Sequence, residues 1–177
     1  MNSFAHLLDR NLHLLQPGIL VVAFIMWAIV VAILFLKGRR ERYSRRRISL
    51  ALLSAAAGFV AIILAEHVSG AIIRQAALNE VAARLSQPVG SVTIDGAKFD
   101  REDELVSALR QMQDTLSHHS HPTTGYHVSI EVPDGVLNFD IRRDSERRRE
   151  YWVYYPNYFY TQSNNIGRMF TDALDGP

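Results

Sequence analysis

Two uncharged apolar stretches separated by a strongly basic segment constrain this chain more than any other feature of its sequence. Residues 18–36 and 48–65 contain no Asp, Glu, Lys or Arg, and residues 37–47 between them carry seven positive charges and one negative charge. Because a helix rises about 1.5 Å per residue, about 18 to 20 apolar residues cross the hydrocarbon layer. A helix also pairs its backbone polar groups within one segment. The pattern predicts a two-helix transmembrane hairpin, with spans over residues 18–36 and 48–66.

The charge distribution predicts the orientation of this hairpin. Short loops rich in Lys and Arg stay in the cytoplasm, and residues 37–47 have a net charge of +6. Residues 1–17 are neutral, and residues 67–177 carry 11 basic against 15 acidic side chains. We therefore expect a multi-pass protein with its N-terminus and its C-terminal domain outside. The 17 arginines against two lysines suggest a GC-rich bacterial genome, and the expected location is the bacterial inner membrane.

Two other interpretations of the apolar stretches were weighed. A cleaved signal peptide has its positive charges before the apolar core, which is the reverse of residues 18–36. Residues 48–65 do follow arginines, and cleavage near residues 68–71 would release a soluble domain. Two core helices of a soluble protein would need to be covered on all sides, for which the 111 residues after the second stretch are too few.

The flanks of the spans have weaker patterns. Residues 1–17 place leucines at roughly helical spacing, which predicts a short amphipathic segment at the outer surface, with a frayed terminus as the alternative. The second span is rich in Ala, Ser and Gly, and small residues allow close helix packing in membranes. It could pack against the first span or form a homo-oligomer. Residues 67–87 continue with helical periodicity and are expected to form a stalk that ends at Pro88.

Residues 88–177 predict a small α+β domain with an antiparallel sheet covered by helices, in the order β-α-β-β-β-α. Residues 91–94 form a short strand, and a helix begins near Asp100. Alternating apolar residues over 128–132 and 137–141 flank a Pro-Asp-Gly turn and predict a hairpin. Residues 150–155 give a further strand, and the spacing of apolar residues over 166–174 predicts a last helix.

Three closely spaced histidines form the chain's one metal-like motif. Imidazole binds zinc, copper or nickel, and His118, His119 and His121 are weak candidate ligands, but a site needs three or four convergent ligands. We interpret this loop as solvated and expect no metal or other cofactor. The alternative function uses the loop, together with Glu66 and His67, in ligand or metal sensing or in transport.

The remaining motifs argue against catalysis and nucleic-acid binding. The sequence has no cysteine, no Gly-x-Ser-x-Gly elbow, no phosphate-binding glycine loop and no His-Glu-x-x-His, so we expect no enzyme. Arginines over residues 142–149 are interrupted by carboxylates, which leaves no basic face to follow a phosphate backbone.

The segment of residues 151–160 holds seven of the chain's 17 aromatic residues. On a strand, Tyr151, Val153 and Tyr155 would share one face, which we assign to the core. Burial of both faces is the alternative. We predict that Trp152, Tyr154 and Tyr158 point outward and bind a protein partner, because aromatic residues dominate binding hot spots. The expected function is a non-catalytic accessory, regulatory or immunity protein whose exported domain binds a partner.

Overall fold

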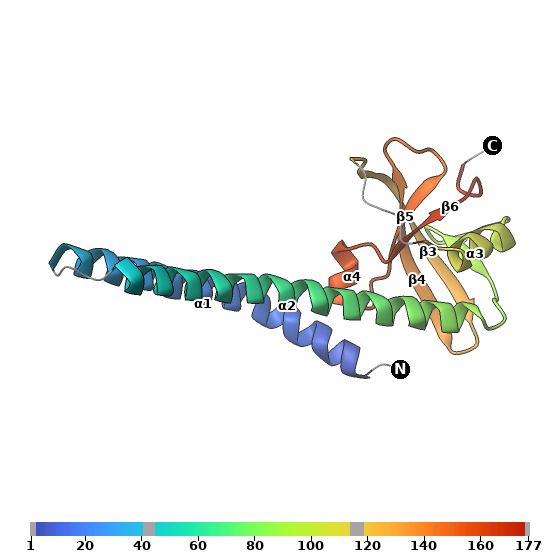
Figure 1. Cartoon of the computed structure of the whole chain (residues 1–177). Coiled ribbons are helices and arrows are strands. Elements are labelled where there is room, and N and C mark those ends of the chain that lie inside the picture. Colours follow the sequence, from blue (N-terminus) through green and yellow to red (C-terminus); the bar gives the residue numbers. More distant parts are fainter. Residues whose placement is uncertain (1–2, 41–44, 114–118, 176–177) are drawn as a thin grey trace. The chain divides into compact units, whose positions relative to one another are not determined.

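The computed structural model describes residues 3–40, 45–113 and 119–175. The chain divides into two compact units, one made of Met1–Asp9 with Ile72–Pro177 and the other of Arg10–Ala71. Two long helices, α1 (Ser3–Arg40) and α2 (Arg45–Leu85), contribute to both units (Figure 1). The smaller unit is helical, and the larger unit contains the sheet.

The helical unit is apolar over much of its surface. Large exposed apolar side chains occur on both helices, at Val21, Phe24, Ile25, Trp27 and Ile29 and at Leu52, Leu53, Phe59, Val60, Ile63, Leu64 and Val68. Among the described residues, one helix segment, Leu52–Leu85, is long and apolar enough to cross a membrane, and a second apolar run, Ala23–Ala32, is shorter. One helix of spanning length is thus found, and the two-helix hairpin stays a prediction.

Helix α1 runs through Pro17, where the sequence had suggested a boundary. Proline lacks an N–H and usually kinks or ends a helix. Here α1 is nevertheless continuous from Ser3 to Arg40. The amphipathic segment that was expected to be separate is the first part of this longer helix. Both helices extend into the predicted basic loop of residues 37–47, because α1 continues to Arg40 and α2 begins at Arg45.

The larger unit is an α+β fold with an antiparallel sheet, as predicted, but the sheet has six strands where four were expected. Its strands are β1 (Val92–Ile94), β2 (Ala97–Lys98), β3 (Pro122–Val132), β4 (Gly135–Asp144), β5 (Glu150–Tyr154) and β6 (Gly167–Phe170), in the spatial order β2-β1-β3-β4-β5-β6. Two short helices, α3 (Glu102–Arg110) and α4 (Phe159–Ser163), lie between strands in the chain. The hairpin of β3 and β4 turns at Gly135, whose φ of 125° suits glycine.

The core lies between one face of the sheet and the helices. Inward residues of the central strands, such as Ile130 and Phe139, are completely buried, as the alternation of apolar residues predicts. Helix α2 contributes Ile73, Ala77, Val81 and Leu85 at i, i+4, i+8 and i+12, and α3 contributes Leu105, Val106, Ala108 and Leu109. The C-terminal part of α2 crosses β4 and β3 in Figure 1. Residues 72–85, which had been expected to form a stalk, therefore belong to the folded unit.

The prediction of a last helix over residues 166–174 is wrong. Residues 167–170 form strand β6, which pairs with β5 through Tyr151↔Met169 and Val153↔Gly167. Helix α4 is short and comes earlier, and the element order is β-β-α-β-β-β-α-β. A Cβ on Gly167 would lie 3.3 Å from the carbonyl oxygen of Gln113. This close backbone packing depends on a segment far away in the sequence, so the local spacing of apolar residues could not predict it.

Candidate partner-binding site

The aromatic segment of residues 151–160 is mostly buried. Tyr151, Val153 and Tyr155 are completely buried, which confirms their assignment to the core. Tyr158 is also completely buried and Tyr154 is 5% exposed. The expectation that Tyr154 and Tyr158 point outward is therefore wrong: Tyr154 is covered on the second face of β5, and Tyr158, at the start of α4, is buried as well.

Trp152 is half-buried on the sheet face opposite the helices. Its Nε1 donates to Asp144 Oδ2 at 2.8 Å, and the guanidinium of Arg168 lies 3.9 Å from its ring centroid. Arg168 in turn pairs with the buried Glu150. The indole is thus fixed by an internal polar network, and its loss would be expected to affect stability. Partner binding through Trp152, Tyr154 and Tyr158 stays a prediction.

A single carboxylate on α2 explains why two tyrosines turn inward. Glu80 Oε1 accepts a hydrogen bond from Tyr155 Oη at 2.8 Å, and Glu80 Oε2 accepts one from Tyr158 Oη at 2.9 Å. Burial raises the pKa of both phenols, and the nearby Glu80 carboxylate raises each pKa further. We call Glu80, Tyr155 and Tyr158 the tyrosine clamp.

The first turns of α1 contact the same region. The ring of His6 stacks on Tyr158 with centroids 4.2 Å apart. The buried carboxylate of Asp9 accepts hydrogen bonds from the backbone N–H groups of Phe159 and Tyr160, at 2.7 and 2.9 Å. Asp9 therefore satisfies amides at the start of α4, which otherwise has no side-chain cap. Sequence reasoning missed Glu80 and Asp9 because their partners are 75 to 151 residues away.

The candidate metal ligands do not converge where the structure describes them. His119 and His121 are exposed, and His118 lies outside the described residues. His127 pairs through Nδ1 with Asp140 at 3.0 Å on the exposed sheet face. Within residues 3–40, 45–113 and 119–175, no group of three or more His, Cys, Asp or Glu side chains could hold a metal ion.

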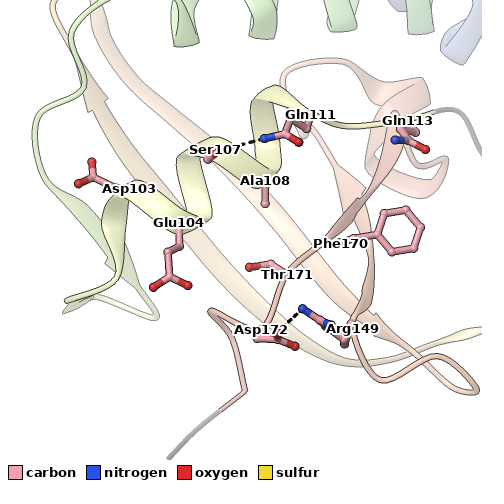
Figure 2. Close-up of a pocket in the computed structure, with 10 residues that line it drawn as sticks. All are labelled: Asp103, Glu104, Ser107, Ala108, Gln111, Gln113, Arg149, Phe170, Thr171 and Asp172. Atoms are coloured by element: carbon pink, nitrogen blue, oxygen red, sulfur yellow. Dashed lines mark hydrogen bonds and ion pairs between the residues drawn. The ribbon is translucent and has the colours of Figure 1, made fainter.

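An open groove between α3 and β6 is the clearest surface recess of the larger unit (Figure 2). It has a volume of about 630 Å³. One wall is the exposed face of α3, the other is the end of β6 with the residues after it, and Arg149 and Gln113 lie at the rim. The lining is mainly polar, at Asp103, Glu104, Ser107, Ala108, Gln111, Gln113, Arg149, Phe170, Thr171 and Asp172.

The strand wall presents backbone groups to the groove. Arg168 exchanges two backbone hydrogen bonds of 2.9 Å with Gln113, so its N–H and C=O point away from β5. Thr171 N–H donates to Arg149 O at 3.0 Å, toward β5. Because these directions alternate along an antiparallel strand, Phe170 points its N–H and C=O to the same side as Arg168. Within the described part of the chain, no strand pairs with Phe170 on that side.

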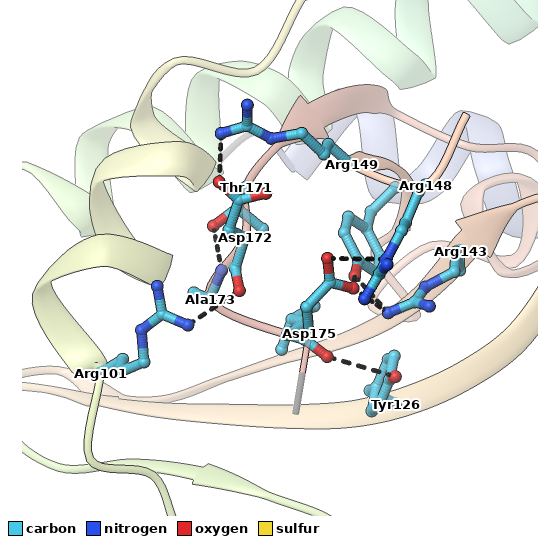
Figure 3. Close-up of polar contacts among 11 residues, drawn as sticks. Arg101, Tyr126, Arg143, Arg148, Arg149, Thr171, Asp172, Ala173 and Asp175 are labelled. Atoms are coloured by element: carbon cyan, nitrogen blue, oxygen red, sulfur yellow. Dashed lines mark hydrogen bonds and ion pairs between the residues drawn. The ribbon is translucent and has the colours of Figure 1, made fainter. Parts of the chain in front are cut away.

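Ion pairs hold the C-terminal segment that forms this wall (Figure 3). Asp175 pairs with Arg143 and lies 3.3 Å from Arg148 Nε, and Asp172 pairs with Arg149. The arginines within residues 142–149, which the sequence gives as interrupted by carboxylates, therefore contact the segment of residues 171–175. Arg148 and Arg149 are mostly exposed, and exposed ion pairs contribute little stability. Their role is to orient the segment.

Comparison with known proteins gives no relative. No family model matches the chain, no curated protein matches it, and no solved structure matches it. The class that the fold defines is an α+β unit with an antiparallel six-stranded sheet that carries a polar groove at its β6 edge.

Proposed function

We propose that this chain is a non-catalytic protein of the bacterial inner membrane, in which two helices anchor an exported α+β domain that binds a protein partner. The observation that carries the proposal is the change of environment along α2. Its large apolar side chains between Leu52 and Val68 are exposed, whereas from Ile73 onward one side of the same helix is buried in the folded unit. A helix that exposes apolar residues on all sides needs lipid around it.

The N-terminal contact supports a second crossing. Ser3–Asp9 belongs to the same compact unit as the sheet, and Asp9 accepts hydrogen bonds from Phe159 and Tyr160. Two segments in contact must lie on the same side of a bilayer, so the chain between them must cross it an even number of times. If α2 crosses, the apolar part of α1 must cross as well.

The groove between α3 and β6 supports a binding role. It combines a strand edge that has no pairing strand at Phe170, within the described part of the chain, with hydrogen-bonding and charged side chains, and protein segments use such features for recognition. An accessory, regulatory or immunity protein needs such a surface and no reaction centre. The partner would be a protein of the membrane or of the compartment outside it.

Topology is tested with reporter fusions. Alkaline phosphatase fused after Pro177 should be active, and the same reporter fused after Arg40, within the basic region, should be inactive. A fluorescent protein that matures only in the cytoplasm should give the opposite pattern. Phosphatase activity at Arg40 with none at Pro177 would overturn the orientation and the exported domain with it.

Partner binding is tested by purification from a bacterial membrane. The full chain should retain one protein in a stoichiometric amount, and a control chain that ends at Ala71 should not. Retention of the same protein by both chains would assign binding to the helical unit and would contradict the proposal for the domain.

A further inference from the structure

We propose that the groove between α3 and β6 binds an extended segment of a protein partner that pairs with the edge of β6 and places a Lys or Arg side chain beside Asp103. This inference rests on the proposed partner-binding function and names the surface and the chemistry of the partner. Three features of the groove support it: the backbone edge at Phe170, the short length of that edge, and the Asp103 carboxylate.

The backbone edge supplies the pairing groups. Phe170 directs its N–H and C=O into the groove, as the bonds of Arg168 and Thr171 on either side require. An unpaired edge is a template for another strand, and extended peptides bind many domains by adding a strand to such an edge. Figure 2 shows Phe170, Thr171 and Asp172 along one side of the groove and α3 along the other.

The usable edge is short, which limits the length of the partner segment. Gln113 already pairs with Arg168, and the carbonyl oxygen of Asp172 already accepts Arg101 Nη1 at 2.8 Å. Phe170 is thus the one residue of the described edge with both backbone groups available. We infer that the partner forms two backbone hydrogen bonds at Phe170 and that its contact spans about three or four residues, at about 3.3 Å per residue. Binding should be weak and reversible.

The charge of the groove selects the side chain of the partner. The ten lining residues include three carboxylates and one guanidinium, that of Arg149. Arg149 pairs with Asp172, and Arg101 beside the groove pairs with Glu104 at 2.5 Å. Asp103 has no ion pair within the described part of the chain and is exposed. One negative charge is therefore uncompensated on the α3 wall, and charge complementarity favours a cationic side chain there.

Defined peptides test the proposal on the full chain in nanodiscs of zwitterionic lipid. The probes are fluorescein-labelled hexapeptides of alternating Lys and Val, Gln and Val, or Glu and Val, with binding measured by fluorescence anisotropy. We expect the Lys peptide to bind at least about tenfold more tightly than the Glu peptide, with the Gln peptide between them. Asp103→Lys should reverse the order. Glu146→Lys, which changes an exposed carboxylate in the β4–β5 turn, is the matched control and should preserve it.

Backbone pairing is tested without altering the protein. N-methylation of alternate amides of the Lys peptide removes hydrogen-bond donors and should weaken binding at least about tenfold in the register that faces Phe170. Equal binding of the Lys and Glu peptides, unchanged binding after N-methylation, or no binding of any peptide would overturn the proposed groove. If a partner still copurifies with the domain in that case, the proposed function stands and only the groove assignment fails.

Discussion

Asp144, at the end of β4, is a buried carboxylate that accepts four hydrogen bonds. They come from the Oγ of Ser120, from Trp152 Nε1, and from the backbone N–H groups of Glu146 and Arg147. Burial alone would raise its pKa, but the four donors stabilise the charged form and lower the pKa below its usual value. Asp144 thus joins the β4–β5 turn to the indole of Trp152.

Asp144→Asn should remove a pH-dependent part of the stability. Because the folded pKa lies below the unfolded value of about 3.9, the ionised carboxylate stabilises the fold above that value and loses this effect as the pH falls toward the folded pKa. We expect the variant to be less stable by about 1–3 kcal/mol at neutral pH, with a smaller difference below about pH 4. Thermal unfolding in detergent between pH 3 and 7 measures this. A difference that does not change with pH would contradict the assignment.

Glu80→Gln should destabilise the tyrosine clamp. The amide retains one acceptor oxygen, but its NH₂ group cannot accept from the second phenol, so one phenol O–H loses its acceptor. An unsatisfied buried polar group costs about 1–3 kcal/mol. Glu146→Gln, at an exposed position, is the control and should change the melting temperature little. Equal melting temperatures of the two variants would show that Glu80 does not organise the tyrosines.

Strand β6 is held to β5 by a buried ion pair as well as by backbone bonds. Arg168 and Glu150 are 4% and 0% exposed at their side chains. Removing one member of a buried pair leaves the other charge uncompensated and typically costs about 3–5 kcal/mol, whereas replacing both with apolar residues can be neutral. Arg147 Nη1 also lies 3.1 Å from Glu150 Oε2, so Glu150 keeps a partly exposed partner when Arg168 is removed. We expect Arg168→Met to destabilise the domain and Glu150→Met with Arg168→Met to recover most of the loss.

The control for this cycle is the exposed pair of Arg149 and Asp172. Arg149→Met should cost less than about 1 kcal/mol, because exposed pairs contribute little. Chemical denaturation of these three variants and of the unchanged chain gives the comparison. A double variant that is as unstable as the single Arg168 variant would mean that lost packing, and not the charge of Glu150, is responsible.

At the scale of elements, the sequence was informative wherever local periodicity matched the tertiary environment. The β3–β4 hairpin and the core face of β5 were predictable because inward residues alternate with polar ones. Strand β6 was not, because the spacing of Ile166, Met169 and Phe170 fits a helix while pairing with β5 makes residues 167–170 extended. Tyr154 and Tyr158 were misjudged because residues of other elements contact them: Arg142 of β4 lies over the Tyr154 ring, and Glu80 of α2 accepts from Tyr158. The groove could not be predicted from the sequence, because its walls come from α3 and β6 and the local patterns do not place these two elements side by side.

At the scale of the whole molecule, the larger unit is assembled from both ends of the described chain. The fragment 72–177 lacks His6 and Asp9, so the amides of Phe159 and Tyr160 lose their acceptor. We expect this fragment to melt at a lower temperature than the same unit in the full chain and to exchange its α4 amides faster. Hydrogen exchange measured by mass spectrometry tests this, with β3 amides as the internal reference. Equal α4 protection in fragment and full chain would contradict the proposed contribution of α1.

The contact of Asp9 with α4 also has a consequence for the order of biogenesis. It closes a loop of about 150 residues, and the entropy cost of such a loop must be met before the contact contributes. During synthesis Asp9 emerges early and the donor amides of α4 are made near the end, so α4 can be capped only after nearly the whole chain has left the ribosome. In the proposed two-span topology, a chain in which one helix fails to cross would place the two segments on opposite sides of the bilayer. The free amides of α4 would then distinguish a misinserted chain from a correctly inserted one.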